Sequence, residues 1–384
     1  MMFMIGLEMI GLKSQPAGLE TNDAGRELTK GNCVVMFPTN GVGFGHFTRM
    51  LALAKRMKKQ DSSLEIIFFT TMPTLHLLKP YGIPAHHISG AKYFKGVDSN
   101  EWNTLLEEEL TLCFEIHKPS MFIFDGAFPY RGMLRAIQGR SKLRKIWMRR
   151  GMFRKGAKIP VDSIQHFDSI IRPGDGIDES DEEINHGLEI LRCPPIIMLD
   201  QSELLSREKA RYRLGIPLGC QAIYVQLGAG QINDISSEIR MTIEELLKNE
   251  DIYIILGESM IGSRIDIELP NVHIIRDYPN SQYFNGFDGV IQAGGYNSFH
   301  ETRAFGLPAL FYPNMETGMD DQLARCLVAE EEGWGYVVQN RTKQQIQQGI
   351  EKLLNHTSKP EPREYVNGAD KLCLELLDSL EVVT

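Results

Sequence analysis

The sequence predicts an α/β protein made of two Rossmann-like domains that face each other across a cleft. In both halves, short apolar runs typical of buried strands alternate with longer stretches of helical periodicity. Each half also begins with a strand that leads through a glycine-rich loop into a helix, at residues 32–58 and again at 221–248. Because open α/β sheets bind ligands beyond the carboxyl ends of their strands, each glycine loop indicates a ligand site.

The length and composition are those of a globular protein with room for two hydrophobic cores. The chain has 384 residues, of which 42% are hydrophobic and 24% are charged. Its net charge of −9 argues against nucleic acid as a partner. The six cysteines show no C-x-x-C pairing and no spacing to histidine typical of a metal site, as expected for a reduced cytoplasmic protein.

Residues 1–30 are expected to be an extension that precedes the first domain. Their start, MMFMIGLEMIGLK, is apolar but too short to cross a bilayer, and no basic region precedes it. Glu8 interrupts the apolar run, so the stretch does not resemble a secretory signal. No later window is long and apolar enough for a transmembrane helix, and the sequence therefore predicts a cytoplasmic location.

Residues 31–192 are predicted to form the first domain, which begins with a strand at 32–38. The glycine-rich loop 39–46 follows, and a helix at 47–58 comes next. His46 stands at the mouth of this loop, and histidine is the side chain best suited to take a proton from a hydroxyl near neutral pH. A dinucleotide-type glycine loop with an incidental histidine accounts for these residues equally well.

Asp125 is the second candidate for a catalytic group. Two strands at 64–70 and 83–88 and a helix at 101–117 precede it, and the strand 120–124 ends at Asp125. A carboxylate at the carboxyl end of a strand can orient and charge-stabilise a histidine on a neighbouring loop. The alternative, an aspartate that caps a helix or stabilises a turn, is equally consistent with the sequence.

A basic stretch at 142–158 follows in the first domain. Such a run is usually a solvated face. Arg149 and Arg150, however, directly follow a predicted strand at 145–148, on the same sheet edge as Asp125. We therefore expect one of them to contact an anionic group of an acceptor or of a donor diphosphate. The stretch also suits peripheral contact with an anionic membrane, as expected if the acceptor is lipid-linked.

Residues 193–362 are predicted to form the second domain. The segment 192–196 contains Pro-Pro, which ends regular structure, and is predicted to be the hinge between the domains. Residues 363–384 are predicted to form a last amphipathic helix that packs back toward the first domain.

The second domain begins with another strand, at 221–226, and another glycine-rich loop. The backbone of this loop, which contains Gly228, Gly230 and Gln231, can approach a diphosphate. Strands at 252–256 and 272–276 follow. Asp277 and Tyr278 come directly after the second of these strands, at the sheet edge expected to face the cleft.

The stretch 290–322 places a strand end, a glycine turn and a helix start next to one another. Gly294 and Gly295 end the strand, and Asn297 and Ser298 are good N-cap residues for a helix over 299–305. Free backbone N–H groups and the positive end of the helix dipole then meet at one point, which is typical of a diphosphate site. An ordinary βα connection would suffice to explain the glycine pair alone.

Three more polar residues favour a nucleotide-sugar site over an ordinary connection. Glu301 lies one turn inside the helix, where a carboxylate can accept hydrogen bonds from neighbouring diol hydroxyls. The next strand is predicted at 309–312, and Asp321 and Gln322 follow it. They therefore lie at the edge where open α/β sheets bind ligands.

The same residues carry a resemblance to a known family. GYNSFHE at 295–301 resembles the G-W-N-S-x-x-E core of the donor-binding signature in family 1 glycosyltransferases. AFGLP at 304–308 resembles the A-G-x-P that follows, and Asp321-Gln322 resembles the closing acid–glutamine pair. GFGH at 43–46 is similar to the G-x-G-H loop of GT-B glycosyltransferases, and the MurG-type enzymes share the plan more loosely. Ala293 departs from the plant-type signature, which has a histidine there, and the segment before Asp321 is a few residues longer.

This resemblance covers nearly the full length and implies the GT-B fold, with acceptor binding in the first domain and nucleotide-sugar binding in the second. It implies that His46 is the catalytic base, that Asp125 supports it, and that Gly43 and Gly45 belong to the acceptor loop. The implied donor contacts are Gly228, Gly230 and Gln231 at the diphosphate, Asp277 and Tyr278 at the base, the Gly294-Gly295 turn with Asn297 and Ser298 at the phosphates, Glu301 at the ribose, and Asp321 and Gln322 at the sugar.

The expected function is sugar transfer from a nucleoside diphosphate sugar, with a UDP-sugar as the expected donor, to an acceptor hydroxyl. The acceptor is expected to be a sugar, a lipid-linked molecule or a small molecule. No Asp-x-Asp ends a strand, so we expect no metal ion and no cofactor in the chemistry. Together with the resemblance, this favours inversion by direct displacement. The adjacent His86 and His87 would point to opposite faces of a strand and are expected to be structural.

Two other functions stay consistent with the sequence. A UDP-sugar 2-epimerase on the same fold would need several ionisable groups that face the sugar, of which only His46 can be named. A non-catalytic nucleotide-sugar-binding subunit would bind the donor without turnover.

Overall fold

The computed structural model of the protein describes residues 32–39, 43–149, 161–175, 187–228, 235–262, 264–317, 320–356 and 366–381. Residues 32–384 fall into one compact unit. The predicted extension 1–30 lies outside the described residues, and so do Arg150, Gly230, Gln231 and most of the basic stretch.

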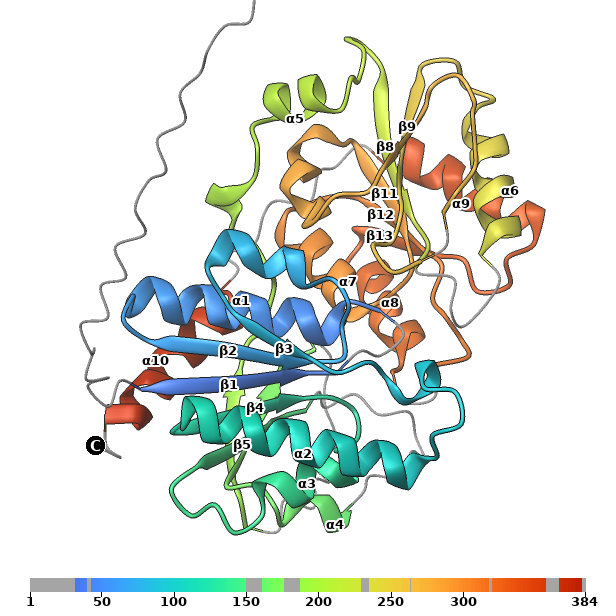
Figure 1. Ribbon diagram of the computed structural model, residues 1–384. Helices are drawn as coiled ribbons and strands as arrows, with labels where there is room; N and C mark the ends of the chain where they lie inside the picture. The colour runs from blue at the N-terminus through green and yellow to red at the C-terminus, as the bar shows by residue number, and fades with distance from the viewer. Residues whose placement is uncertain are drawn as a thin grey trace, which may run out of the picture. The chain divides into compact units, whose positions relative to one another are not determined.

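The first half of the chain forms a sheet of parallel strands in the order β3-β2-β1-β4-β5-β6-β7, which confirms the predicted α/β class (Figure 1). The strands are β1 (Cys33–Pro38), β2 (Glu65–Thr70), β3 (Ala85–His87), β4 (Met121–Asp125), β5 (Arg144–Met148), β6 (Ser169–Pro173) and β7 (Glu189–Cys193). The register pairs Pro38 with Asp125 and Asp125 with Met148. The carboxyl ends of β1, β4 and β5 are therefore level with one another.

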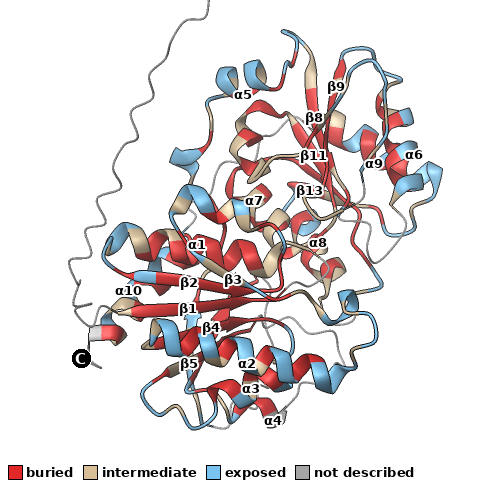
Figure 2. Cartoon of the chain, in the orientation of Figure 1, coloured by how far each residue is buried: buried red, intermediate tan, exposed pale blue. Residues whose placement is uncertain are grey.

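Helices cover both faces of this sheet, which explains why its strands read as continuous apolar runs. Val34 and Met36 of β1 pack with the apolar residues of α1 (Gly45–Gln60) and α10 (Gly368–Glu381). Val35 and Phe37 point to the opposite face and pack with α2 (Ser99–His117) and α3 (Arg131–Ile137). Figure 2 shows that the strands between the helices are buried along most of their length.

The second half repeats the design in a sheet with the order β10-β9-β8-β11-β12-β13. Its strands are β8 (Gln221–Gln226), β9 (Ile252–Gly257), β10 (Val272–Ile275), β11 (Gly289–Gln292), β12 (Ala309–Phe311) and β13 (Gly335–Val337). Ile223 and Val225 of β8 face α6 (Ser236–Leu246) and α9 (Lys343–Leu354). Tyr224 points to the core that contains α7 (Tyr296–Ala304) and α8 (Gln322–Glu331).

Short helices connect these layers. They are α4 (Val161–Ile164), α5 (Arg207–Arg213) and the 3-10 helices η1 (Leu75–Tyr81), η2 (Ala91–Tyr93), η3 (Gln201–Glu203) and η4 (Asn280–Gly286). Among the described residues, no helix combines the length and the apolar character needed to cross a membrane.

The last helix, α10, packs on the sheet of the first half, against α1 and β7. Leu372 and Leu376 contribute its apolar face to the core. Arg56 of α1 donates hydrogen bonds to Asp370 at 2.9 Å and to Asp200 at 2.6 Å, so one buried guanidinium joins α1, α10 and the segment before η3.

Two of the differences between predicted and observed element boundaries concern the hinge and the candidate site. β7 extends to Cys193, so the predicted hinge at 192–196 begins inside a strand and Pro194-Pro195 follows it directly. α7 begins at Tyr296, with Gly295 as its N-cap in extended conformation. Asn297 and Ser298 were predicted as N-cap residues. They lie in the first turn of α7 instead, because the helix begins directly after the Gly294-Gly295 turn.

Candidate active site

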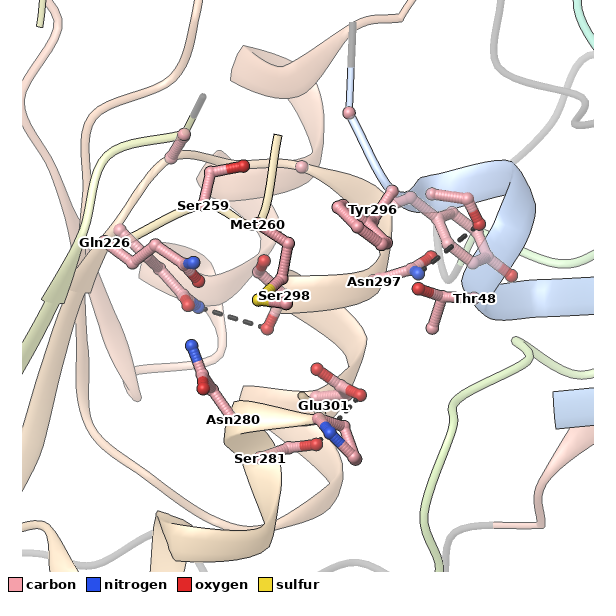
Figure 3. A pocket seen from close by; sticks show the side chains of 18 of the residues that line it. Thr48, Gln226, Ser259, Met260, Asn280, Ser281, Tyr296, Asn297, Ser298 and Glu301 are labelled. Atoms are coloured by element: carbon pink, nitrogen blue, oxygen red, sulfur yellow. Dashed lines mark hydrogen bonds between the residues drawn. The ribbon is translucent and has the colours of Figure 1, made fainter. Parts of the chain in front are cut away.

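A cavity of about 560 Å³ lies between the two halves. Its lining follows β1 and β4 of the first sheet and β8, β9, β10, β11 and β12 of the second, so the carboxyl ends of both sheets contribute. Figure 3 shows polar side chains that converge on it, among them Thr48 of α1 and Gln226, Asn280 and Glu301 of the second half.

Most of the residues predicted for the site line this cavity. They are Gly43, Gly45 and His46 from the first half, and Gly228, Asp277, Tyr278, Gly295, Asn297, Ser298, Glu301 and Gln322 from the second. Gly228 has a φ of 105°, which favours glycine and turns the chain sharply after β8.

His46 is held at the cavity wall by a buried carboxylate. Its Nδ1 atom lies 2.7 Å from Oδ1 of Asp125. The two residues meet because β1 and β4 are paired in parallel, so the start of α1 and the end of β4 lie side by side. The His46 side chain is 20% exposed, whereas Asp125 is 1% exposed. The structure therefore brings the two predicted catalytic residues together.

Arg49, one turn further along α1, binds the same carboxylate. Its Nε donates to Oδ2 of Asp125 at 3.1 Å, and its Nη2 donates to Oδ1 at 2.7 Å. Burial by itself would raise the pKa of Asp125, but the Arg49 charge and the contact with His46 outweigh it and hold that pKa below its usual value. Asp125 is therefore ionised at neutral pH.

The contact between His46 and Asp125, at 2.7 Å, is shorter than the 3.0 Å between Nδ1 of His46 and Nη2 of Arg49, and it favours one tautomer of the imidazole. An ionised carboxylate only accepts hydrogen bonds, so Nδ1 of His46 donates to Asp125. A neutral imidazole has one N–H, so its Nε2 then carries a lone pair. This is the tautomer that a general base requires.

The first turn of α7 forms another part of the cavity wall. Gly295 is the N-cap, and as a glycine it has no side chain that could cap the helix. The first backbone N–H groups and the positive end of the helix dipole therefore lie beside the cavity. Asn297 also reaches across to the first half, where its Nδ2 donates to the carbonyl of Gly45 at 3.4 Å (Figure 3).

Glu301 lies one turn further along α7, at the cavity wall. Its Oε1 accepts a hydrogen bond from the Ser281 hydroxyl at 3.1 Å (Figure 3). Burial raises the pKa of Glu301 to about 7, although the bonds from Ser281 and from the Met198 backbone oppose the shift. The carboxyl therefore changes charge near neutral pH.

Tyr278 links the two halves at the cavity. Its hydroxyl donates to Oγ1 of Thr48 at 3.0 Å, and its ring lies 5.6 Å from that of Phe44. The peptide bond to Pro279 is cis. Asp277 accepts hydrogen bonds from the Tyr278 backbone N–H at 2.7 Å and from the Tyr283 hydroxyl at 2.5 Å, so neighbouring residues hold its carboxylate.

The acidic residue that lines the cavity before α8 is Asp320, whereas the sequence predicted Asp321. Asp321 is the N-cap of α8, and its side chain accepts a hydrogen bond from the Ala324 N–H at 3.0 Å. Asp320 is bound to Arg325 at 2.7 Å and lies beside Gln322 at the cavity. The cap requires the last residue before the helix, so the preceding acid is the one left facing the cavity.

Solved structures share this architecture, although no family model and no curated protein matches the sequence. The glycotransferase of kitacinnamycin is 14% identical, with a TM-score of 0.63 and coverage of 91% of this chain and 99% of that one. MurG of Acinetobacter baumannii is 13% identical, with a TM-score of 0.56 and coverage of 91% and 99%. The spinosyn rhamnosyltransferase SpnG complexed with thymidine diphosphate is 13% identical, with a TM-score of 0.56 and coverage of 91% and 96%.

The chain has the GT-B fold. At these identities the likeness extends to the fold alone, and it confirms the fold that the motif resemblance implied.

Besides Asp321, two other predicted contacts among the described residues are not part of the GT-B cavity lining. Arg149 is 3% exposed and its guanidinium lies 5.4 Å from the Trp147 ring centre, because the residue at the end of β5 turns toward the α2 face of the sheet. Gly294 packs against α8 and does not line the cavity. A Cβ there would lie 2.3 Å from Sγ of Cys326 and 3.1 Å from the Gln322 carbonyl, so this glycine allows α8 to approach the turn.

Several residues of the GT-B cavity were not predicted. Arg49 is the most important, and its signal was present, since Arg49 and Arg56 lie among the apolar residues of α1 that are buried. Tyr224 of β8 accepts a hydrogen bond from Asn280 at 2.9 Å and donates one to Gln226 at 3.0 Å. No local motif indicates the contact between Tyr224 and Asn280, because the two residues are 56 positions apart in the sequence.

Proposed function

We propose that the protein is a glycosyltransferase that moves a sugar from a nucleoside diphosphate sugar to an acceptor hydroxyl with inversion. The observation that carries the proposal is the pairing of two features across one cavity. His46, oriented by Asp125, lies on one wall, and the first turn of α7, whose N-cap is a glycine, lies on the other. The contact of Asn297 with the Gly45 carbonyl brings these walls together.

The donor would bind mainly to the second half. Its diphosphate would accept hydrogen bonds from the first N–H groups of α7, where the helix dipole favours negative charge. Glu301, one turn deeper in α7, would accept hydrogen bonds from the ribose hydroxyls. Ser281, which contacts Glu301, would donate a hydrogen bond to them. Gln322 and Asp320 would contact the sugar hydroxyls from the start of α8.

The proposed reaction is a single displacement. The acceptor oxygen would attack the anomeric carbon as its proton passes to Nε2 of His46, and the bond from that carbon to the diphosphate oxygen would break. The leaving diphosphate would gain negative charge at the first turn of α7, where fixed N–H dipoles stabilise it. Asp125 would stabilise the imidazolium that forms, without taking its proton.

The nucleotide base and the acceptor are the less defined parts of the proposal. The sequence motif favours a UDP-sugar, whereas SpnG, which shares the fold, was solved with thymidine diphosphate. The acceptor is proposed to be a sugar, lipid-linked or small-molecule alcohol that enters beside Gly43 and Gly45. The basic stretch 142–158 would hold the protein at an anionic membrane if the acceptor is lipid-linked.

Calorimetry with UDP- and dTDP-sugars tests donor binding, and product analysis with a panel of alcohol acceptors tests transfer. We expect His46→Ala to leave the donor Kd within about twofold and to lower turnover by about 10² to 10⁴. Turnover that survives unchanged in this variant would overturn the catalytic assignment. NMR of the donor incubated with the protein alone detects an epimerase, which would form a new sugar without any acceptor.

The proposal includes a metal-independent reaction and no cofactor. Excess EDTA should leave the transfer rate unchanged, since the charge of the leaving diphosphate is assigned to α7. Complete loss of activity that only Mg²⁺ or Mn²⁺ restores would contradict this part of the proposal.

A further inference from the structure

Three side chains that bind metals meet at the edge of the first sheet. His86 belongs to β3, and Cys113 and His117 lie one turn apart on α2. Their donor atoms all lie within 4.8 Å of one another. None of the three residues lines the cavity between the halves. The sequence had shown no such site, because His86 comes from a strand that precedes α2.

The two imidazoles face each other within this cluster. Nε2 of His86 lies 2.9 Å from Nε2 of His117, and the two rings are nearly perpendicular, with centroids 5.1 Å apart. Zinc–nitrogen bonds of about 2.0 Å and zinc–sulfur bonds of about 2.3 Å place tetrahedral ligands roughly 3.3 to 3.7 Å apart. Small rotations of these side chains therefore suffice to surround an ion.

Glu65 orients one of the two imidazoles. Its Oε1 lies 3.1 Å from Nδ1 of His117. A carboxylate accepts the Nδ1 proton, which leaves the Nε2 lone pair of His117 directed at His86 and Cys113. This carboxylate–histidine pair is the usual outer arrangement around a histidine that binds a metal.

We propose that His86, Cys113 and His117 form a zinc site, with water as the fourth ligand. Two imidazoles and a thiolate are the donor set that zinc prefers, whereas magnesium and calcium prefer oxygen. Zinc would form a bond to the Cys113 sulfur as the thiol proton leaves to solvent, and the His86 proton would move from Nε2 to Nδ1. The site would fasten the carboxyl-terminal end of α2 to the edge strand β3.

The cluster also has a metal-free explanation. His86 can donate from Nε2 to Nε2 of His117, and Cys113 can serve as a small apolar residue, 0% exposed, in the core under α2. The side chain of His117 is 17% exposed, so an ion could still reach the cluster from solvent. Metal binding by the intact protein separates the two explanations.

Titration of the full-length, reduced protein with Co²⁺ tests the site, because a cobalt–thiolate bond adds a charge-transfer band in the near ultraviolet. We expect one equivalent to saturate this band and zinc to displace it. Cys113→Ser should abolish the band. Cys373→Ser, which alters another buried helix cysteine, should retain it, as should His87→Gln, which alters the exposed neighbour of His86.

Thermal unfolding adds a measurement that does not depend on the cysteine variant. Zinc should raise the unfolding midpoint of the wild-type protein and leave that of His86→Asn unchanged. Glu65→Gln should weaken cobalt binding about tenfold or more. A wild-type protein with no saturable cobalt band, or a band of equal intensity in Cys113→Ser, would overturn the proposal. Neither result depends on glycosyl transfer.

Discussion

Arg49 controls the charge of the carboxylate that orients His46. Both Arg49 and Asp125 are buried, so each depends on the other for its counter-charge. Arg49→Met should lower the free energy of unfolding by about 3 to 5 kcal/mol, since it removes the cationic partner of the buried Asp125 carboxylate and leaves it only the contact with His46. Chemical denaturation measures this loss. In the same variant, kcat should fall by a larger factor than KM changes, because Arg49 does not contact the donor directly in the proposed reaction.

A double-mutant cycle provides the control for this prediction. Arg49→Met combined with Asp125→Leu removes both charges, and we expect the double variant to be less destabilised than Arg49→Met alone. Equal destabilisation would show that packing of the arginine stem, and not its charge, is what the fold requires.

Glu301 makes donor binding depend on pH. Its pKa of about 7 means that the carboxyl is mostly protonated below neutrality, whereas ribose hydroxyls bind best to a carboxylate. Donor affinity should therefore rise about tenfold from about pH 6 to about pH 8 and then level off. Calorimetry with a nucleoside diphosphate sugar measures this, because its diphosphate loses no proton in that range. Glu301→Gln should bind weakly and show no such rise.

The same residue makes the opposite contribution to the stability of the unbound protein. Its pKa is about 7 in the folded state and near the ordinary 4.5 in the unfolded chain, so the protonated form favours folding. This contribution is full below about pH 4.5 and is lost as the pH rises through about 7. Glu301→Gln should therefore gain about 1 to 3 kcal/mol relative to the wild type at pH 8. A loss of stability there would contradict the assigned direction of the shift.

At the residue scale, the sequence identified the groups beside the cavity and the carboxylate that orients His46, but not Arg49, which binds that carboxylate. His46, Asn297 and Glu301 stand in recognisable local patterns and line the cavity. Arg49 and Asp125 are 76 residues apart, and only the pairing of β1 with β4 brings them together. Asp320, and not the predicted Asp321, lines the cavity, because Asp321 is the N-cap of α8. Which of two adjacent acids becomes the cap depends on backbone geometry.

At the element scale, the two adjacent glycines in the turn between β11 and α7 have different environments. Gly294 packs against α8, whereas Gly295 lines the cavity. Gly294→Ala would place a Cβ 2.3 Å from Cys326 Sγ, so we expect the unfolding midpoint to fall by several degrees, for a loss of about 1 to 3 kcal/mol. Gly295→Ala meets nothing within 4 Å and has an ordinary backbone conformation. It should keep its stability and weaken donor binding, because its methyl group would enter the cavity.

Calorimetry and thermal unfolding of both variants check this contrast. Adding Cys326→Ala to Gly294→Ala should restore part of the lost stability, since it removes the sulfur while the Gln322 carbonyl stays close. If Gly295→Ala bound the donor as well as the wild type, the diphosphate would not lie against the first turn of α7.

Elements with a strong apolar signal were predicted well, whereas the edge strand β7 was missed. β1, β4 and β8 are buried on both faces and read as apolar runs. β7 lies at the edge of the first sheet, and four of its five residues are partly or fully exposed, so no strand was predicted there and its last two residues, Arg192 and Cys193, were assigned to the hinge 192–196. An edge strand has little apolar pattern to detect.

At the scale of the whole molecule, the sequence predicted two glycine-loop sheets but not the polar contacts between them. Asp175, which follows β6, accepts hydrogen bonds from Arg325 of α8 at 2.6 Å and lies 3.0 Å from Nε2 of His300 on α7. All three side chains are buried. The segment before Asp175 and the α7–α8 region are more than a hundred residues apart, and no local motif indicates that they meet.

This buried network should couple the donor wall to the first half. The Arg325 guanidinium also donates to the Gly294 carbonyl at 2.7 Å, so it supports the turn that leads into α7. Arg325→Met should cost about 3 to 5 kcal/mol of stability, because Asp175 loses its charged partner, and should weaken donor binding as the turn loosens. Denaturation and calorimetry measure the two effects. If Arg325→Met lost stability but bound the donor as well as the wild type, the network would not support donor binding.

The pH dependence of stability reports on the same network. Burial by itself would raise the pKa of Asp175, but Arg325 and His300 outweigh it and hold that pKa well below the ordinary 3.8. The stabilisation is therefore complete above about pH 4 and is lost as the pH falls toward the depressed native pKa. Asp175→Asn should lose this acid-sensitive stabilisation, so its unfolding free energy should differ from that of the wild type more at pH 6 than at pH 3. An equal difference at both pH values would mean that the Asp175 carboxylate contributes through shape and hydrogen bonding, without net charge pairing.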